Sequence, residues 1–200
     1  PNGECYTGFT LSFDELTALL DKIFFTKIVI NSLVAYRNVR DVLRYVHQLR
    51  IKNSSLKIIY NVHDFFLICP NCNLVDSNDK FCGFTTDHDC LSCINFYKSK
   101  QPDYENHLFY GEYDNPSQWR SMWQKFLLED AEEVVCFSKS SCELVSRFYP
   151  NISAKLRLIP HFVRPLRSVN VAPHNCVNIA VLGKVDAIPK GKAVVEKLSI

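Results

Sequence analysis

The sequence predicts an α/β fold with a Rossmann-like parallel sheet, and three observations support this prediction. Residues 27–31 and 57–62 are short β-branched runs typical of strands. The segment between them repeats apolar residues at helical spacing, so the order is that of a βαβ unit. Both runs are almost continuously apolar, which is typical of parallel strands covered by helices on both faces.

The elements alternate along the chain. Ser12 and Glu15 form a capping-box pattern, which predicts a helix that begins there. Ser138 is placed to cap a later helix that ends before Pro150. The expected order is helix 12–23, strand 27–31, a helix from about 39 to 49, strand 57–62, helix 116–129, strand 133–137, a helix from 138 to about 148, and strand 156–160.

Two stretches interrupt this alternation. Residues 65 to about 115 hold five of the nine cysteines and many aromatic residues, and we interpret them as an insertion over one edge of the sheet. Residues 161–176 contain prolines without periodicity, which is typical of a linker. A new strand-turn-helix pattern follows. We therefore expect one domain over residues 1–175 and the beginning of a second, truncated domain over 176–200.

Composition excludes several classes of protein. The 23 basic and 21 acidic residues give a formal charge of +2, which argues against a nucleic-acid partner. No apolar run approaches the roughly 20 residues of a membrane helix, so we expect a soluble domain. The chain does not start with Met and ends inside a helical pattern, and we expect it to be a fragment of a longer protein.

His63 is the first candidate for chemistry. It follows strand 57–62 directly, and ligands of open α/β sheets bind at the carboxyl ends of the strands. The alternative is a partly buried histidine whose ring is held by Asp64 or by a backbone carbonyl.

The cysteines of the insertion are the second candidate. Cys69 and Cys72 form one pair with two residues between, and Cys90 and Cys93 form another, which is the spacing of a tetrahedral zinc knuckle. His88 is a possible substitute ligand. Reduced thiols packed in an aromatic insertion, or one or two disulfides, remain the alternatives.

Several segments, read in order, resemble a branch of the bacterial family 4 glycosyltransferases, which share the two-domain GT-B fold. The resemblance is carried by residues 62–70, by Phe81-Cys82-Gly83, by the strand with its flanks at 130–138, and by residues 158–161, and it reaches Gly183-Lys184 and Lys190-Gly191. Each match is short, but their shared order is specific. The matches span about residues 12–199.

The resemblance implies a nucleotide-sugar donor that carries UDP, GDP or dTDP, and a glycan or lipid-linked acceptor. It also implies cytoplasmic synthesis of cell-surface polysaccharide, with the inner face of the membrane as a possible location. His63 and Asp64 then correspond to the catalytic histidine segment. The donor diphosphate is expected at a strand end followed by a helix N-terminus, which favours a phosphate. The residues expected to bind it are Gly183, Lys184, Lys190 and Gly191.

The same resemblance points to Cys69, Cys82, Cys90 and Cys93 as ligands of a structural zinc, with Cys72 as an extra cysteine. It implies no catalytic metal. Lys184 stands where many relatives carry arginine, and a lysine cannot make the bidentate contact that arginine makes with a phosphate. The alternative for this loop is a pair of solvated lysines beside a tight turn.

The resemblance also implies transfer with retention of configuration. The acidic pair that grips the donor in this family would lie beyond residue 200, so we expect little or no activity from these 200 residues alone. A non-catalytic, zinc-stabilised α/β module that binds carbohydrate or protein is the main alternative. A GT-B epimerase or phosphorylase is a third.

Overall fold

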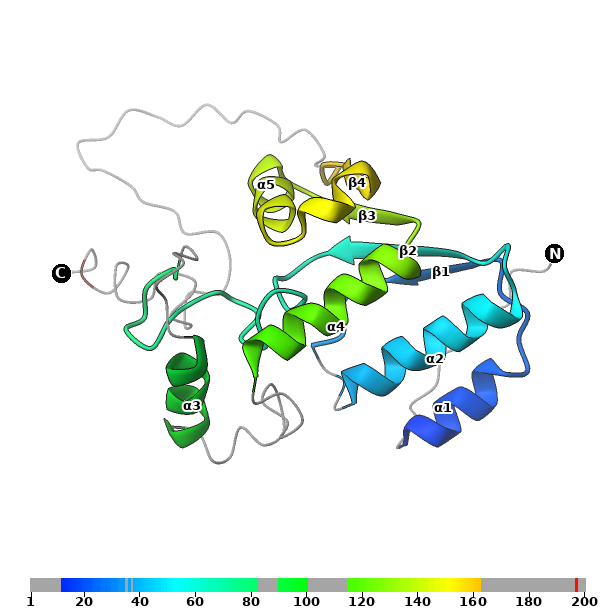
Figure 1. Ribbon diagram of the computed structural model, residues 1–200, viewed down its shortest axis with the longest axis horizontal. Coiled ribbons are helices and arrows are strands. Elements are labelled where there is room, and N and C mark those ends of the chain that lie inside the picture. Colours follow the sequence, from blue (N-terminus) through cyan, green and yellow to red (C-terminus); the bar gives the residue numbers. More distant parts are fainter. Residues whose placement is uncertain are drawn as a thin grey trace, which may run out of the picture.

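The computed structural model describes residues 12–34, 36, 38–82, 90–100, 115–162 and 197. Within these residues, four parallel strands form one sheet in the order β1-β2-β3-β4 (Figure 1). This architecture is α/β and Rossmann-like, as the sequence predicts. The strands are β1 (Lys27–Ile30), β2 (Lys57–Val62), β3 (Glu133–Cys136) and β4 (Leu156–Leu158). The domain boundary expected near residue 175, and everything predicted after it, lies outside the described residues.

The helices expected in the described part are present, with ends shifted by a few residues. At the first of them, the Ser12 hydroxyl accepts the Glu15 N–H at 3.2 Å and the Glu15 carboxylate accepts the Ser12 N–H at 3.1 Å, so the capping box is confirmed. Within the described residues, none is long and apolar enough to cross a membrane. The helices are α1 (Phe13–Leu20), α2 (Val39–Lys52), α3 (Cys90–Lys100), α4 (Pro116–Glu129), α5 (Lys139–Phe148) and the 3-10 helix η2 (Pro150–Lys155).

Helix α3 was not expected from the sequence, because the segment between the second strand and α4 shows no strong periodicity. It buries Cys93 and Ile94, while its neighbours Leu91 and Ser92 are exposed, so its apolar face is narrow. The last strand is also shorter than expected. Pro150 opens the 3-10 helix η2, and β4 pairs with β3 over three residues.

The described helices between the strands share one face of the sheet. Crossover connections between parallel strands are almost always right-handed. Because each new strand is added at the same edge of the sheet, in the order β1-β2-β3-β4, the helices α2, α4 and α5 of these crossovers lie on the same face. Their buried residues join one cluster with Ile58, Tyr60 and Val62 of β2. The opposite face carries Val29, which is 49% exposed. Among the described residues, helices cover one face of the sheet, where the sequence led us to expect helices on both; on the other face Val29 is exposed and Val135 is buried.

Aromatic rings fill the core under α4. Trp119 and Trp123 are 1% and 0% exposed, so Trp119 serves packing and is not available to stack on a sugar ring. Trp123 meets Tyr60 of β2 edge to face, with ring centroids 5.2 Å apart. Phe66, four residues past the end of β2, lies 4.8 Å from Trp119. This cluster joins α4 to β2 and to the chain that leaves it.

Lys155 fastens the end of η2 to the end of α4. Its ammonium group donates to the carbonyls of Leu127, Leu128 and Ala131, at 3.1, 2.5 and 2.7 Å. The last carbonyls of a helix have no partner within the helix, so one side chain satisfies several groups at once. Burial lowers the pKa of Lys155, which shows that the ammonium has given up water for these contacts.

Replacing Lys155 by Met should lower the free energy of unfolding by roughly 1–3 kcal/mol, because the carbonyls at the end of α4 lose a charged donor. Urea unfolding followed by circular dichroism at neutral pH measures the change. The control is Lys139→Met, because Lys139 is 85% exposed and pairs with Glu143 at 3.8 Å, a surface contact whose loss should cost about 0.5 kcal/mol or less. Equal effects of the two substitutions would contradict the role given to Lys155.

Candidate functional site

The carboxyl edge of the sheet brings His63 together with two other rings. His63 follows β2, and its exposed ring lies 4.6 Å from that of Phe137, which follows β3. The ring of His161, three residues past β4, stacks on Phe137 at 4.0 Å and lies 5.8 Å from His63. Sequence reasoning identified His63 but missed Phe137 and His161. The position of His63 at a strand end is as predicted, and its catalytic role stays a prediction.

Asp64 connects the ends of two neighbouring strands. Its carboxylate accepts a hydrogen bond of 2.6 Å from the Ser32 hydroxyl, after β1, and one of 2.9 Å from the N–H of Phe66. The Asp64 carboxylate is thus bound to Ser32 and to the Phe66 N–H rather than to the ring of His63. Asp64 fixes the turn that carries His63, and its direct part in a reaction stays a prediction.

The chain after Asp64 runs through the core. Residues 66–68 are 3% exposed or less, and their backbone carbonyls need partners because water is excluded. The carbonyl of residue 66 accepts from Trp119 Nε1 at 2.7 Å, that of residue 67 from the Tyr149 hydroxyl at 2.6 Å, and that of residue 68 from Arg120 Nε at 3.1 Å. Side chains of α4 and of the end of α5 therefore hold the segment that follows His63.

Arg120 extends this arrangement to the cysteine-rich insertion. Its Nη2 lies 3.2 Å from the sulfur of Cys90, the first residue of α3. Its guanidinium carbon also lies 5.2 Å from the ring centroid of Phe148, a cation–π contact with α5. One side chain of α4 thus contacts the buried segment, the start of α3 and α5.

The first part of the insertion is a small hairpin supported by α3. Val75 and Phe81 form an antiparallel bridge, and the Cys82 N–H donates to the carbonyl of Leu74 at 2.9 Å. The hydroxyl of Tyr97 on α3 donates to the carbonyl of Val75 at 3.2 Å and to that of Asp76 at 2.6 Å. Cys82 at the end of the hairpin and the cysteines of the first turn of α3 belong to one packed unit.

The thiols of this unit influence each other. Burial raises the pKa of Cys69 to about 12, and the thiols of Cys93, Cys82 and Cys90 add to the rise. Burial also raises the pKa of Cys72, to about 11, but there Asp64 is the neighbour that adds to it.

Within the described part of the chain, no disulfide joins these cysteines. Among the described residues, no group of three or more His, Cys, Asp and Glu side chains stands close enough to hold a metal ion. His88, the possible substitute ligand, lies outside the described residues. The zinc site therefore stays a prediction.

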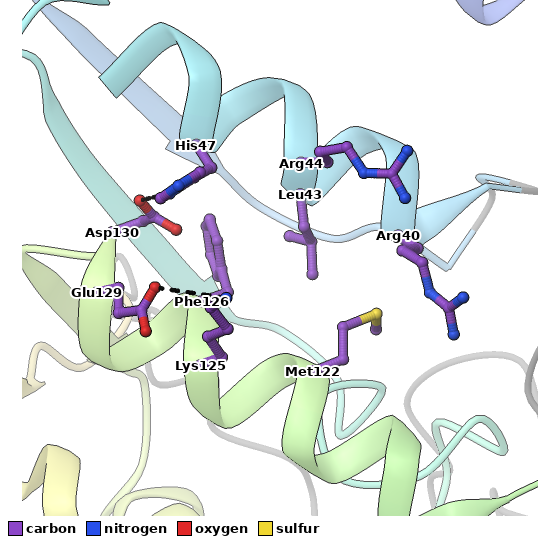
Figure 2. Close-up of a pocket in the computed structure, with 9 residues that line it drawn as sticks. All are labelled: Arg40, Leu43, Arg44, His47, Met122, Lys125, Phe126, Glu129 and Asp130. Carbon is purple, nitrogen blue, oxygen red and sulfur yellow. Dashed lines mark hydrogen bonds and ion pairs between the residues drawn. The ribbon is translucent and has the colours of Figure 1, made fainter. Parts of the chain in front are cut away.

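A cavity of about 210 Å³ lies between α2 and α4, away from His63 (Figure 2). Its floor is apolar, with Leu43, Met122 and Phe126. Its charged residues are largely paired: His47 Nδ1 lies 2.7 Å from the Asp130 carboxylate, and Lys125 and Glu129 form an ion pair at 4.0 Å. The side chains of His47, Asp130, Lys125 and Glu129 are thus engaged with one another, and the cavity is not our candidate site.

The residues expected to bind the donor diphosphate are Gly183, Lys184, Lys190 and Gly191, and they lie outside the described residues. Comparisons of the chain with family models, with curated protein sequences and with solved structures find no match. The carboxyl edge around His63 is therefore the candidate site on its geometry alone.

Tyr149→Phe tests the anchoring of the segment after His63. Loss of the hydroxyl leaves the buried carbonyl of Leu67 without this donor, and the free energy of unfolding should fall by roughly 1–3 kcal/mol at pH 7. Burial raises the pKa of Tyr149 above its ordinary 10.0. A group whose pKa rises on folding stabilises the fold fully below its unfolded pKa, and this contribution is lost as the pH rises through the folded pKa.

The wild-type chain should therefore lose stability above about pH 10, and Tyr149→Phe should lose less over the same range. Urea unfolding at several pH values between 7 and 11 measures both slopes. Tyr36→Phe is the control, because Tyr36 is 41% exposed. Parallel curves for wild type and Tyr149→Phe would show that Tyr149 does not cause the alkaline loss.

Proposed function

We propose that this chain is the acceptor-side domain of a nucleotide-sugar-dependent glycosyltransferase of the GT-B kind, with the beginning of its donor-binding domain. The full-length enzyme moves a sugar from a UDP-, GDP- or dTDP-sugar to a glycan or lipid-linked acceptor in the cytoplasm, at or near the membrane surface. The observation that carries the proposal is the placement of His63: its exposed imidazole stands at the carboxyl end of a parallel strand.

The setting of His63 supports a role in contacting a ligand. Its ring is exposed, while the segment that follows it is buried and anchored by Trp119, Tyr149 and Arg120. A reactive or binding group must be held by a rigid support, since a displacement of about 1 Å costs roughly 100-fold in rate. In the proposed two-domain enzyme, the exposed side of the ring would face the second domain.

The chemistry proposed for His63 is positioning. A neutral imidazole offers one donor and one acceptor, which suits hydrogen bonds to the hydroxyl groups of the donor sugar. In a retaining reaction the leaving diphosphate itself helps to remove the acceptor proton, and groups that stabilise its charge supply the main catalytic effect. Gly183, Lys184, Lys190 and Gly191 are the residues proposed to bind it.

His63→Ala in the full-length protein should lower turnover of the preferred nucleotide-sugar by about 100-fold, because the donor sugar loses a positioning contact. Release of nucleotide diphosphate from UDP-, GDP- and dTDP-sugars, with an acceptor extract, measures it. The control is His47→Asn, in which the amide nitrogen replaces the Nδ1 that contacts Asp130. A His63 variant within twofold of the parent would refute the role.

The alternative of a non-catalytic binding module makes a different prediction in the same assay. The wild-type protein would then release no nucleotide diphosphate, and no nucleotide-sugar would raise its melting temperature. Soluble glycans would raise the melting temperature in its place, and His63→Ala would weaken that effect.

We also propose that Cys69, Cys82, Cys90 and Cys93 bind a structural zinc ion. Four cysteine thiolates are a donor set of closed, structural zinc sites, in which no coordination position is left for substrate. Burial now favours the protonated thiols, and a bound zinc ion reverses this by stabilising the thiolates. The ion would brace the hairpin and α3 beside the site without taking part in transfer.

Protein purified without chelator should contain about one zinc ion per chain by elemental analysis. Cys82→Ser should abolish zinc binding, whereas Cys72→Ser should retain it, because the family resemblance indicates Cys82 as a ligand and Cys72 as an extra cysteine. If Cys72→Ser abolishes zinc binding and Cys82→Ser retains it, the ligands are the two pairs predicted from sequence spacing, with Cys72 in place of Cys82. Zinc-free protein whose thiols all react freely would rule the site out.

A further inference from the structure

The three rings at the carboxyl edge form a compact triangle. The centroid distances are 4.0 Å from Phe137 to His161, 4.6 Å from His63 to Phe137 and 5.8 Å from His63 to His161. The Phe137 and His161 rings are nearly parallel, at 11°, and the two imidazoles are within 25° of parallel. Phe137 is thus in contact with both imidazoles.

The backbone fixes this triangle through the register of three neighbouring strands. Val62 pairs with Cys136, and Cys136 pairs with Leu158, so His63 and Phe137 occupy equivalent positions one residue past their strands. Beyond β4, the N–H of Ile159 still donates to the carbonyl of Cys136 at 2.9 Å. The chain therefore stays beside β3 until just before His161.

Exposure divides the three rings into two kinds. His63 and His161 are exposed, whereas Phe137 is half-buried. The Asp64 carboxylate is engaged by Ser32 and by the N–H of Phe66. Within the described residues, ring contacts with Phe137 and His161 are what hold the imidazole of His63. Phe137 therefore supports the ring from the protein side, while both imidazoles are exposed.

We propose that Phe137 is a positioning residue for His63 and that His161 is a second imidazole that contacts the ligand. Two adjacent imidazoles offer their ring nitrogens to more than one hydroxyl group of the same molecule, which suits a polyol such as a pyranose. The part that concerns the ligand rests on the glycosyltransferase proposal. The part that concerns Phe137 rests on ring geometry and is tested without substrate.

The first arm of the experiment is NMR of the full-length protein with ¹³C-labelled histidine. The imidazole resonances are assigned with His63→Gln and His161→Gln. Phe137→Leu should shift the resonances of both imidazole rings, because the ring current of Phe137 is lost. Leucine is chosen because it keeps most of the apolar volume. Phe162→Leu is the control, since Phe162 is 86% exposed beside His161. Unchanged His63 resonances in Phe137→Leu would overturn the positioning role.

The second arm is steady-state kinetics with the nucleotide-sugar that the wild-type protein turns over best. Phe137→Leu should lower kcat about tenfold with KM changed less than about threefold, because ligand contacts remain while His63 is misplaced. Wild-type kcat in Phe137→Leu would contradict the positioning role even if the NMR shifts are seen.

His161 is tested by two replacements. His161→Phe keeps the stacking ring and removes both nitrogens, whereas His161→Gln keeps a polar group. We expect His161→Phe to lower kcat/KM about tenfold, and His161→Gln to recover part of this loss. If His161→Phe matches the wild type, His161 serves stacking alone and its ligand contact is refuted.

Failure of the transferase proposal has a separate outcome. If the wild-type protein turns over none of the UDP-, GDP- and dTDP-sugars, that proposal fails and takes the sugar contact of His161 with it. The NMR arm still tests whether the ring of Phe137 contacts that of His63, and unchanged His63 resonances would still overturn the positioning role.

Discussion

The fold depends on how the buried carbonyls after β2 find their partners. A chain that leaves a sheet normally runs over the surface, where water satisfies its backbone. Here residues 66–68 cross the core, and Trp119, Tyr149 and Arg120 replace the water. The three donors come from α4 and from the residue that ends α5, so the same bonds that satisfy the segment also fix both helices against β2. The candidate site and the cysteine-rich insertion start from the two ends of this segment.

Much of the fold could be predicted from local sequence signals. The β-branched run of β2 predicts a strand, and the capping residues Ser12 and Ser138 predict the starts of helices. Both signals depend on only a few neighbouring residues. Helix α3 could not be predicted, because its buried face is too narrow to produce a helical repeat of apolar residues in the sequence. The buried segment could not either, because its donors lie more than 50 residues away along the chain. In the described residues, the position of the helices on one face follows from the strand order, which periodicity does not encode.

The candidate site divides in the same way. His63 was found because a histidine directly after a predicted strand has a defined place in a parallel sheet. Phe137 and His161 were missed because their contacts need the relative register of three strands, which follows from packing. For the cysteines, spacing favoured Cys72 and the resemblance favoured Cys82. The hairpin that ends at Cys82 is supported by Tyr97 of α3, and the choice between the two ligand sets stays a prediction. The lysine loop that we predict to bind the donor diphosphate lies outside the described residues.

The long connection between β2 and β3 has a consequence for the order in which the chain folds. Strands β3 and β4 are joined by α5 and η2, so they belong to a local unit that closes a short loop. Pairing β2 with β3 must close the whole stretch from Val62 to Glu133, which costs more chain entropy. A metal ion held by the cysteines would close a smaller loop inside that stretch and shorten its effective length. In such a chain, the ion would act as a folding accelerator as well as a brace.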